Sequence, residues 1–142
     1  MPTLRHVLPI LAVSCLAGAP ALAAELEVVV TGVTTDRGTI GCSLHREAQG
    51  FPGSGALAEV TVQPGQGTAS CRFSDLQSGR YAVAVAHDVN GNGRIDTNFL
   101  GIPQEPWAVS GNVRPLMRAP NFNEAAFDLG EGPHRIEISL TR

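Results

Sequence analysis

The chain has 142 residues, of which 43% are hydrophobic and 16% charged, and its net charge is −3. This length suits one domain with a single core. There is no lysine, and the arginines are scattered without forming a basic stripe, which argues against nucleic-acid binding.

Residues 1–23 have the features of a secretory signal peptide. Arg5 precedes an uncharged apolar run, and a small-x-small pattern ends at Ala23. We expect cleavage near Ala23, which places a single mature domain, 24–142, in the periplasm or outside the cell. The alternatives are a membrane anchor, which the prolines within the run disfavour, and a lipoprotein site at Cys15. The mature part has no second apolar run long enough to span a bilayer.

Beyond Ala23, apolar residues alternate with a period of two, which is typical of β-strands. Turn residues at 36–38 and 64–67 predict hairpins, and apolar residues on both faces of 79–88 predict a central strand. No helix longer than a turn or two is expected. The predicted strands are 25–33, 38–45, 58–63, 67–74, 79–88, 123–129 and 134–142.

The fold class predicted from this pattern is all-β: an antiparallel β-sandwich, transthyretin-like or immunoglobulin-like, with one long irregular excursion over 89–121. The order Leu76-x-x-Gly79-x-Tyr81 refines it. In such sandwiches a tyrosine near a strand start ties back to the preceding corner.

Cys42 and Cys71 remain after processing, and an exported chain meets an oxidising compartment. Alternation places both on the apolar faces of their strands. We therefore expect a disulfide between them, with two reduced structural cysteines as the alternative. A metal site is not expected at the pair, because neither a CxxC motif nor clustered histidines accompany it.

The segment "DVNGNGRID" (88–96) concentrates oxygen-bearing side chains around two glycines. Its spacing matches the first nine positions of a calcium loop, with ligands from the side chains of Asp88, Asn90, Asn92 and Asp96 and the carbonyl of Arg94. The sequence thus predicts a Ca²⁺ site of weak affinity, with Kd of roughly 10⁻⁴–10⁻³ M.

The match to a calcium loop ends at position 12, where Phe99 replaces the usual bidentate glutamate, so the segment is not an EF-hand. Glu105 or Glu124 could complete the ligand set if the chain folds back. The alternative is a metal-free turn, because Asn-Gly-Asn-Gly favours positive φ and Asp and Asn brace turns with their own side chains.

No catalytic motif is present, so catalysis has no positive support and no catalytic residue is assigned. An uncharacterised enzyme using His87, Asp88 or Asp96 as an acid or base is the less favoured alternative. His87 ends a buried face and is expected to be structural. Trp107 is expected to cover the sandwich edge, with an exposed binding aromatic as the alternative.

Two stretches, "GRYAVAVAHDVNGNGRIDTNFLGIPQEP" and "APNFNEAAFDL", resemble the DUF2141 family of small exported bacterial proteins of unknown function. The resemblance covers about 25–141 and implies a β-sandwich and export. It implies no reaction, substrate or cofactor.

We therefore expect a non-catalytic binding or structural module of the bacterial envelope. Its partner would be an envelope polymer or another protein. Its 88–96 loop would be stabilised by Ca²⁺ or, alternatively, would be metal-free in an accessory domain.

Overall fold

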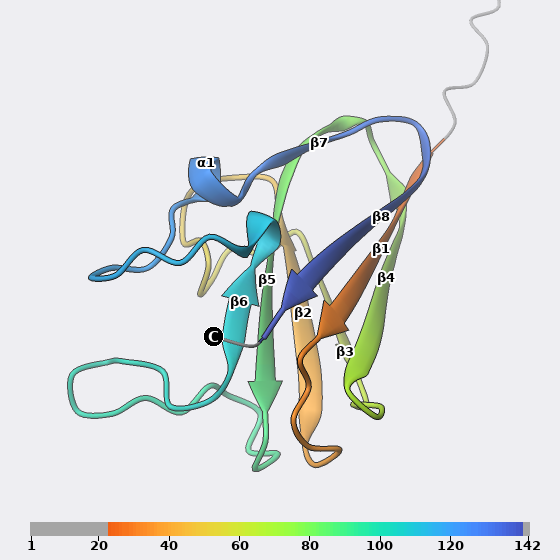
Figure 1. Ribbon diagram of the computed structural model, residues 1–142. Coiled ribbons are helices and arrows are strands. Elements are labelled where there is room, and N and C mark those ends of the chain that lie inside the picture. Colours follow the sequence, from red (N-terminus) through yellow and green to blue (C-terminus); the bar gives the residue numbers. More distant parts are fainter. Residues whose placement is uncertain (1–22, 141–142) are drawn as a thin grey trace, which may run out of the picture.

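The computed structural model describes residues 23–140. The predicted signal peptide, 1–23, lies outside them apart from its last residue. Ten elements follow one another along the chain, and Figure 1 shows their arrangement. They are β1 (Ala24–Thr31), β2 (Thr39–His45), β3 (Ala58–Val62), β4 (Thr68–Leu76), β5 (Gly79–Asp88), β6 (Trp107–Val109), the 3₁₀ turn η1 (Ser110–Asn112), α1 (Phe122–Ala125), β7 (Phe127–Leu129) and β8 (Gly132–Ser139).

The strands form two sheets that pack face to face, which confirms the all-β sandwich. One sheet has the order β4-β1-β8, and the other has the order β3-β2-β5-β6, with β7 paired to β5. β5 pairs on both edges, as its two apolar faces predicted. The pairing is antiparallel except between β1 and β8, which run parallel from Ala24↔Gly132 to Thr31↔Ser139.

Both predicted hairpins are wrong. The turns at 36–38 and 64–67 carry the chain from one sheet to the other, because β1 and β4 lie in the three-stranded sheet and β2 and β3 in the other. A Gly-rich turn signals a reversal of the chain, but not whether the next strand pairs or crosses the sandwich. β2 and β3 do pair as a hairpin, across the 46–57 connection.

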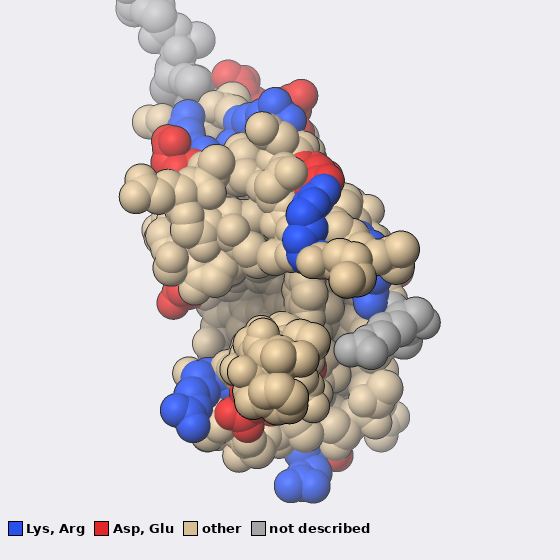
Figure 2. Space-filling model, turned by 90° about the vertical axis from the view of Figure 1, so that its left-hand side faces the viewer, with Lys and Arg blue, Asp and Glu red and all other residues tan. Residues whose placement is uncertain are grey.

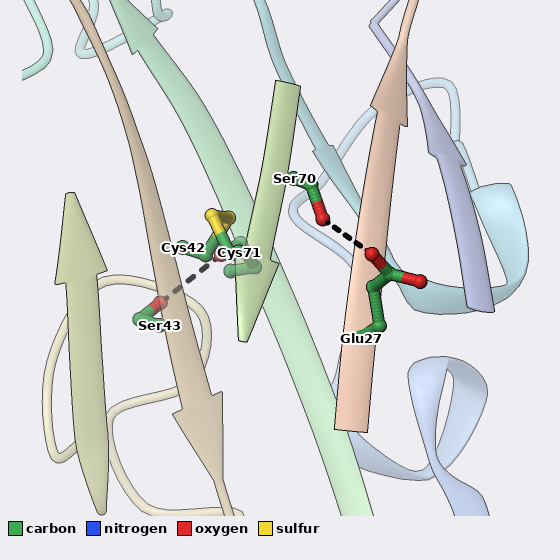
Figure 3. The surroundings of a disulfide bond; sticks show 6 residues. Glu27, Cys42, Ser43, Ser70 and Cys71 are labelled. Atoms are coloured by element: carbon green, nitrogen blue, oxygen red, sulfur yellow. Dashed lines mark hydrogen bonds between the residues drawn. A yellow bond between two sulfur atoms is a disulfide. The ribbon is translucent and has the colours of Figure 1, made fainter. Parts of the chain in front are cut away.

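The main core lies between the sheets and is made by alternate residues of both. Leu26, Val28, Ile40, Val83 and Ile138 are at most 1% exposed. The bridge between Cys42 of β2 and Cys71 of β4 crosses this core, which confirms the predicted disulfide (Figure 3).

Tyr81 closes the corner between β4 and β5. Its hydroxyl donates to the carbonyl of Gln77 over 2.7 Å, and its ring is buried. This contact confirms the role expected of a tyrosine near the start of the strand.

A smaller apolar cluster covers one end of the outer face of β5. It contains Ala82, Val109, Phe122 and Ala125. The strand predicted over 123–129 is wrong in its first half, because residues 122–125 form the one-turn helix α1. Asn121 and Glu124 form a reciprocal capping box that satisfies its first N–H groups. No helix among residues 23–140 is long and apolar enough to cross a membrane.

Candidate functional site

The loop after β5 is organised by the carboxylate of Asp88, the last residue of that strand. Its oxygens accept the backbone N–H groups of Gly91 at 2.8 Å, Asn92 at 3.1 Å and Gly93 at 2.7 Å. Gly91 and Gly93 have φ of 73° and 80°, so both occupy the left-handed region that glycine enters without strain. A buried side chain thus replaces the strand partner that this backbone lacks.

Asp96 lies on the opposite side of the same loop. Its carboxylate accepts the side-chain amides of Asn90 at 2.6 Å and Asn92 at 2.9 Å. Hydrogen bonds from Asn92 and Asn90 hold the pKa of Asp96 below its usual value. Arg94 lies beside it, with its Nε 3.6 Å from the carboxylate.

Glu105 returns to the loop from the far end of the excursion and is only 9% exposed. Its Oε1 accepts the N–H groups of Val89 at 2.8 Å and Asn90 at 3.4 Å, and its Oε2 accepts that of Asp96 at 3.0 Å. Of the two completing carboxylates predicted, Glu105 therefore reaches the loop.

Glu124 does not reach it. Its carboxylate pairs with Arg118 and accepts the N–H of Asn121 at the start of α1. These contacts, led by the hydrogen bond from Arg118, lower the pKa of Glu124 to about 2.

The predicted ligand residues otherwise lie together, but their oxygens already face N–H donors. The amide oxygens of Asn90 and Asn92 accept the backbone N–H groups of Asn92 and Arg94. Among residues 23–140, no three His, Cys, Asp or Glu side chains are grouped as a metal site. A bound Ca²⁺ would require the amides to rotate their oxygens inward, so the calcium site stays a prediction.

His87 faces the interior, and its Nε2 lies 2.8 Å from the carbonyl oxygen of Arg37. The ring is fully buried. It therefore ties β5 to the 36–38 turn, and the structure does not bring it together with Asp88 or Asp96 as an acid–base pair.

A groove of about 410 Å³ lies on the outer face of the five-stranded sheet. Small residues of β2 and β5 form its floor, and the 95–103 part of the excursion overhangs one end. Figure 2 shows the surface hollowed on this side, beside projecting segments. The floor residues are Gly41, Ser43, Ala84 and Ala86.

The overhang is held by backbone pairing within the excursion. Gln104 N–H donates to the Asp96 carbonyl at 2.8 Å, and Thr97 bridges Pro103. At the other end of the excursion, His87 N–H donates to Pro106 O at 2.9 Å. These backbone contacts act together with the hydrogen bonds that Asp88 and Glu105 accept from the 89–96 backbone. Together they fix the position of the groove's rim.

Trp107 forms one wall of the groove. It is half-buried on β6, where it pairs with Ala86 and packs on the smaller apolar cluster. Trp107 therefore contacts the smaller cluster and lines the groove as well. The sequence analysis missed this groove, although the run of small residues at alternate positions of 82–86 indicated an outer face with room above it.

The fold and this site define an all-β sandwich with a groove on the outer face of one sheet and a carboxylate-braced loop at its rim. The sequence matches the family described as an uncharacterised protein conserved in bacteria, DUF2141, over residues 28–137. The chain belongs to this family. Comparisons with curated proteins and with solved structures found no match.

Proposed function

We propose that this protein is an exported, non-catalytic binding module of the bacterial envelope. Its ligand would be an envelope polymer or protein that places an apolar part in the groove. The groove on the outer face of β2 and β5 carries the proposal, because apolar walls with a few polar groups are typical of binding sites.

The chemistry of the lining indicates what kind of group fits. Glu59 is the one charged residue in it, and its other polar side chains are the hydroxyls of Ser43, Thr61 and Thr97 and the indole of Trp107. An uncharged or weakly polar group therefore fits better than an ionic one, whose desolvation these residues would not offset.

A groove-filling variant tests the binding function. Gly41 has ordinary φ, and a Cβ there would approach nothing closer than the Ala86 carbonyl at 4.0 Å. Gly41→Leu should therefore fold and fill the floor. Gly130→Leu makes the same substitution between β7 and β8, where a Cβ would meet His134 at 3.6 Å.

The probe is the uncharged apolar fluorophore Nile red, followed by solubilised envelope polymers. We expect the wild type and Gly130→Leu to bind and Gly41→Leu to lose at least about tenfold in affinity, which corresponds to about 1.4 kcal/mol. Equal binding by all three proteins would contradict the proposal.

Export is supported by the residues of 1–23 and by the Cys42–Cys71 bridge, since disulfides persist in oxidising compartments. Cell fractionation and mass spectrometry of the expressed chain test it. A mature N-terminus at Ala24 in the periplasm or medium is the expected result. An uncleaved chain in the cytoplasm would contradict it.

Calcium binding by the 88–96 loop is a second proposal. It is supported by the return of Glu105, which brings a third carboxylate to the loop beside Asp88 and Asp96. The ion would be held by oxygens of Asp88, Asn90, Asn92 and Asp96 and the Arg94 carbonyl, and would stabilise the loop without taking part in a reaction.

Melting with Ca²⁺ and with chelator tests this second proposal, together with elemental analysis of the purified protein. A tenfold excess of Ca²⁺ over Kd should stabilise the fold by about 1.4 kcal/mol. Asp96→Asn should abolish the rise in Tm, and Glu124→Gln, outside the loop, should keep it. No change in wild-type Tm at several millimolar Ca²⁺ would exclude the site and favour the metal-free turn.

A further inference from the structure

Two segments of the 89–121 excursion carry large apolar side chains that are exposed to solvent at their tips. At the first tip, residues 99–102, Phe99 is 95% exposed and Leu100 is 68% exposed. At the second tip, residues 116–117, Leu116 and Met117 are 97% and 96% exposed. Large apolar side chains standing almost wholly in water, in two groups, mark an interaction surface rather than ordinary scatter.

The first tip is held in its exposed position by its own hydrogen bonds. The side-chain oxygen of Asn98 accepts the N–H groups of Leu100 at 2.9 Å and Ile102 at 3.0 Å, and Gly101 N–H donates to the Asn98 carbonyl. The chain thus forms a short hydrogen-bonded turn whose apolar side chains point into solvent.

The second tip is braced at both ends by arginines. Arg114 donates to the Ser139 carbonyl at 2.6 Å, and Arg118 pairs with Glu124 at 2.6 Å. Leu116 and Met117 lie between these two anchors, so their exposure also belongs to the fold.

Both tips project from the same side of the sandwich, one in the upper and one in the lower half of Figure 1. Figure 2 looks onto this side, where the two projecting segments flank the hollow. A flat surface that touched one tip could therefore touch the other.

The charges around the tips differ from those of the whole chain. Residues 97–104 contain no charged side chain, and 113–121 contain Arg114 and Arg118 without an acidic residue. Among residues 23–140, no carboxylate forms an ion pair with Arg114. Arg118 is neutralised by its ion pair with Glu124, so Arg114 is the uncompensated charge beside the second tip. Since charges beyond about 8–10 Å are screened at physiological salt, this local positive charge counts for more at the tip than distant carboxylates do.

We propose that the two tips dock the protein on an anionic phospholipid surface. A fluid interface accepts two separate apolar prongs without matching pits, whereas a folded protein partner would need a cavity for each. Arg114 then lies at headgroup depth, where it favours anionic lipids. Docking in this way turns the groove toward the membrane, but it does not depend on what the groove binds.

Vesicle sedimentation of the folded, disulfide-bonded protein tests the proposal. The vesicles contain phosphatidylethanolamine with phosphatidylglycerol, and phosphatidylcholine vesicles serve for comparison. The test variant carries Phe99→Ser, Leu116→Ser and Met117→Ser, and the matched control is Leu57→Ser, a 56% exposed residue outside both tips.

We expect the wild type and Leu57→Ser to bind the anionic vesicles, more weakly at high salt and on phosphatidylcholine. The triple variant should lose at least about tenfold in partitioning, since each deeply inserted apolar side chain contributes to it. Because these side chains are exposed, the variant should keep the wild-type Tm and bind Nile red in the groove as the wild type does.

Three outcomes would overturn the proposal: no vesicle binding by the wild type, equal binding by the triple variant, or lipid-free self-association that the triple variant abolishes. The last outcome would assign the tips to a second copy of the chain. The Gly41→Leu variant separates the two proposals, since it should lose groove binding and still sediment with vesicles.

Discussion

The sandwich and its long excursion are stabilised in different ways. Within each sheet, strand pairing satisfies the hydrogen-bonding groups of the backbone. Between the sheets, apolar side chains such as Val28 and Ile40 are completely buried. Over residues 89–106, strand pairing is almost absent, and two buried carboxylates, Asp88 and Glu105, accept six backbone N–H groups instead.

This difference shows how an irregular segment can satisfy its backbone N–H groups without strand pairing. A carboxylate has enough lone pairs to accept hydrogen bonds from several N–H groups at once. Two side chains can therefore replace the backbone hydrogen bonds that a neighbouring strand would provide. The difference also predicts that different substitutions destabilise the sandwich and the excursion.

The largest expected effect is in the sandwich. Replacing both cysteines, Cys42→Ala and Cys71→Ala, removes a bridge of sequence separation 29. In the chain-entropy model this costs about 3–4 kcal/mol, and the cavity left in the core adds to it. Denaturant unfolding measures the loss. A loss below about 1 kcal/mol would mean that the bridge constrains the unfolded chain little.

Asp88→Ala should have the next largest effect, and it should be confined to the excursion. Three N–H groups lose a charged acceptor, which costs about 2–3 kcal/mol after the loop relaxes into water. Hydrogen exchange should show lost protection over 89–106, with β1 and β2 unchanged. Uniform loss over the whole sandwich would contradict the separation of the two regions.

Tyr81→Phe should cost about 1 kcal/mol, because it removes the hydrogen bond to the Gln77 carbonyl and keeps the buried ring. The measurement is urea unfolding beside Phe73→Leu, a core change without a lost hydrogen bond. Stability equal to that of the wild type would mean that water replaces the lost contact.

The smallest effect concerns Glu124 and acid pH. Its pKa falls from 4.5 to about 2 on folding, so its stabilising contribution is complete above pH 4.5 and is lost as the pH falls through about 2. Glu124→Gln should flatten the dependence of Tm on pH in this window. Glu131→Gln, a substitution on the exposed connection before β8, should leave the slope as in the wild type.

Features that depend on the alternation of residues along one strand could be predicted from the sequence. Features that depend on which strands pair in space could not. Cys42 and Cys71 could be assigned to inward faces, and Tyr81 to a corner, from local order alone. The turns at 36–38 and 64–67 could not be assigned to sheet crossings, because the local signal of a crossing equals that of a hairpin.

The candidate site, too, could be predicted only in part from the sequence. The residues of 88–96 lie together because they are neighbours in the chain, as expected. The choice between Glu105 and Glu124 depended on how a long excursion folds back, which local pattern does not encode. The groove depended on which strands place small residues side by side, and that required the sheet order.

The parallel pairing of β1 with β8 has a consequence for how the molecule is made. Ala24 aligns with Gly132, so the three-stranded sheet joins one end of the domain to the other. β1 can find this neighbour only after the chain has been synthesised as far as β8, and such distant contacts make folding slow. Under the export proposed above, this sheet could be completed only after β8 had followed β1 across the membrane.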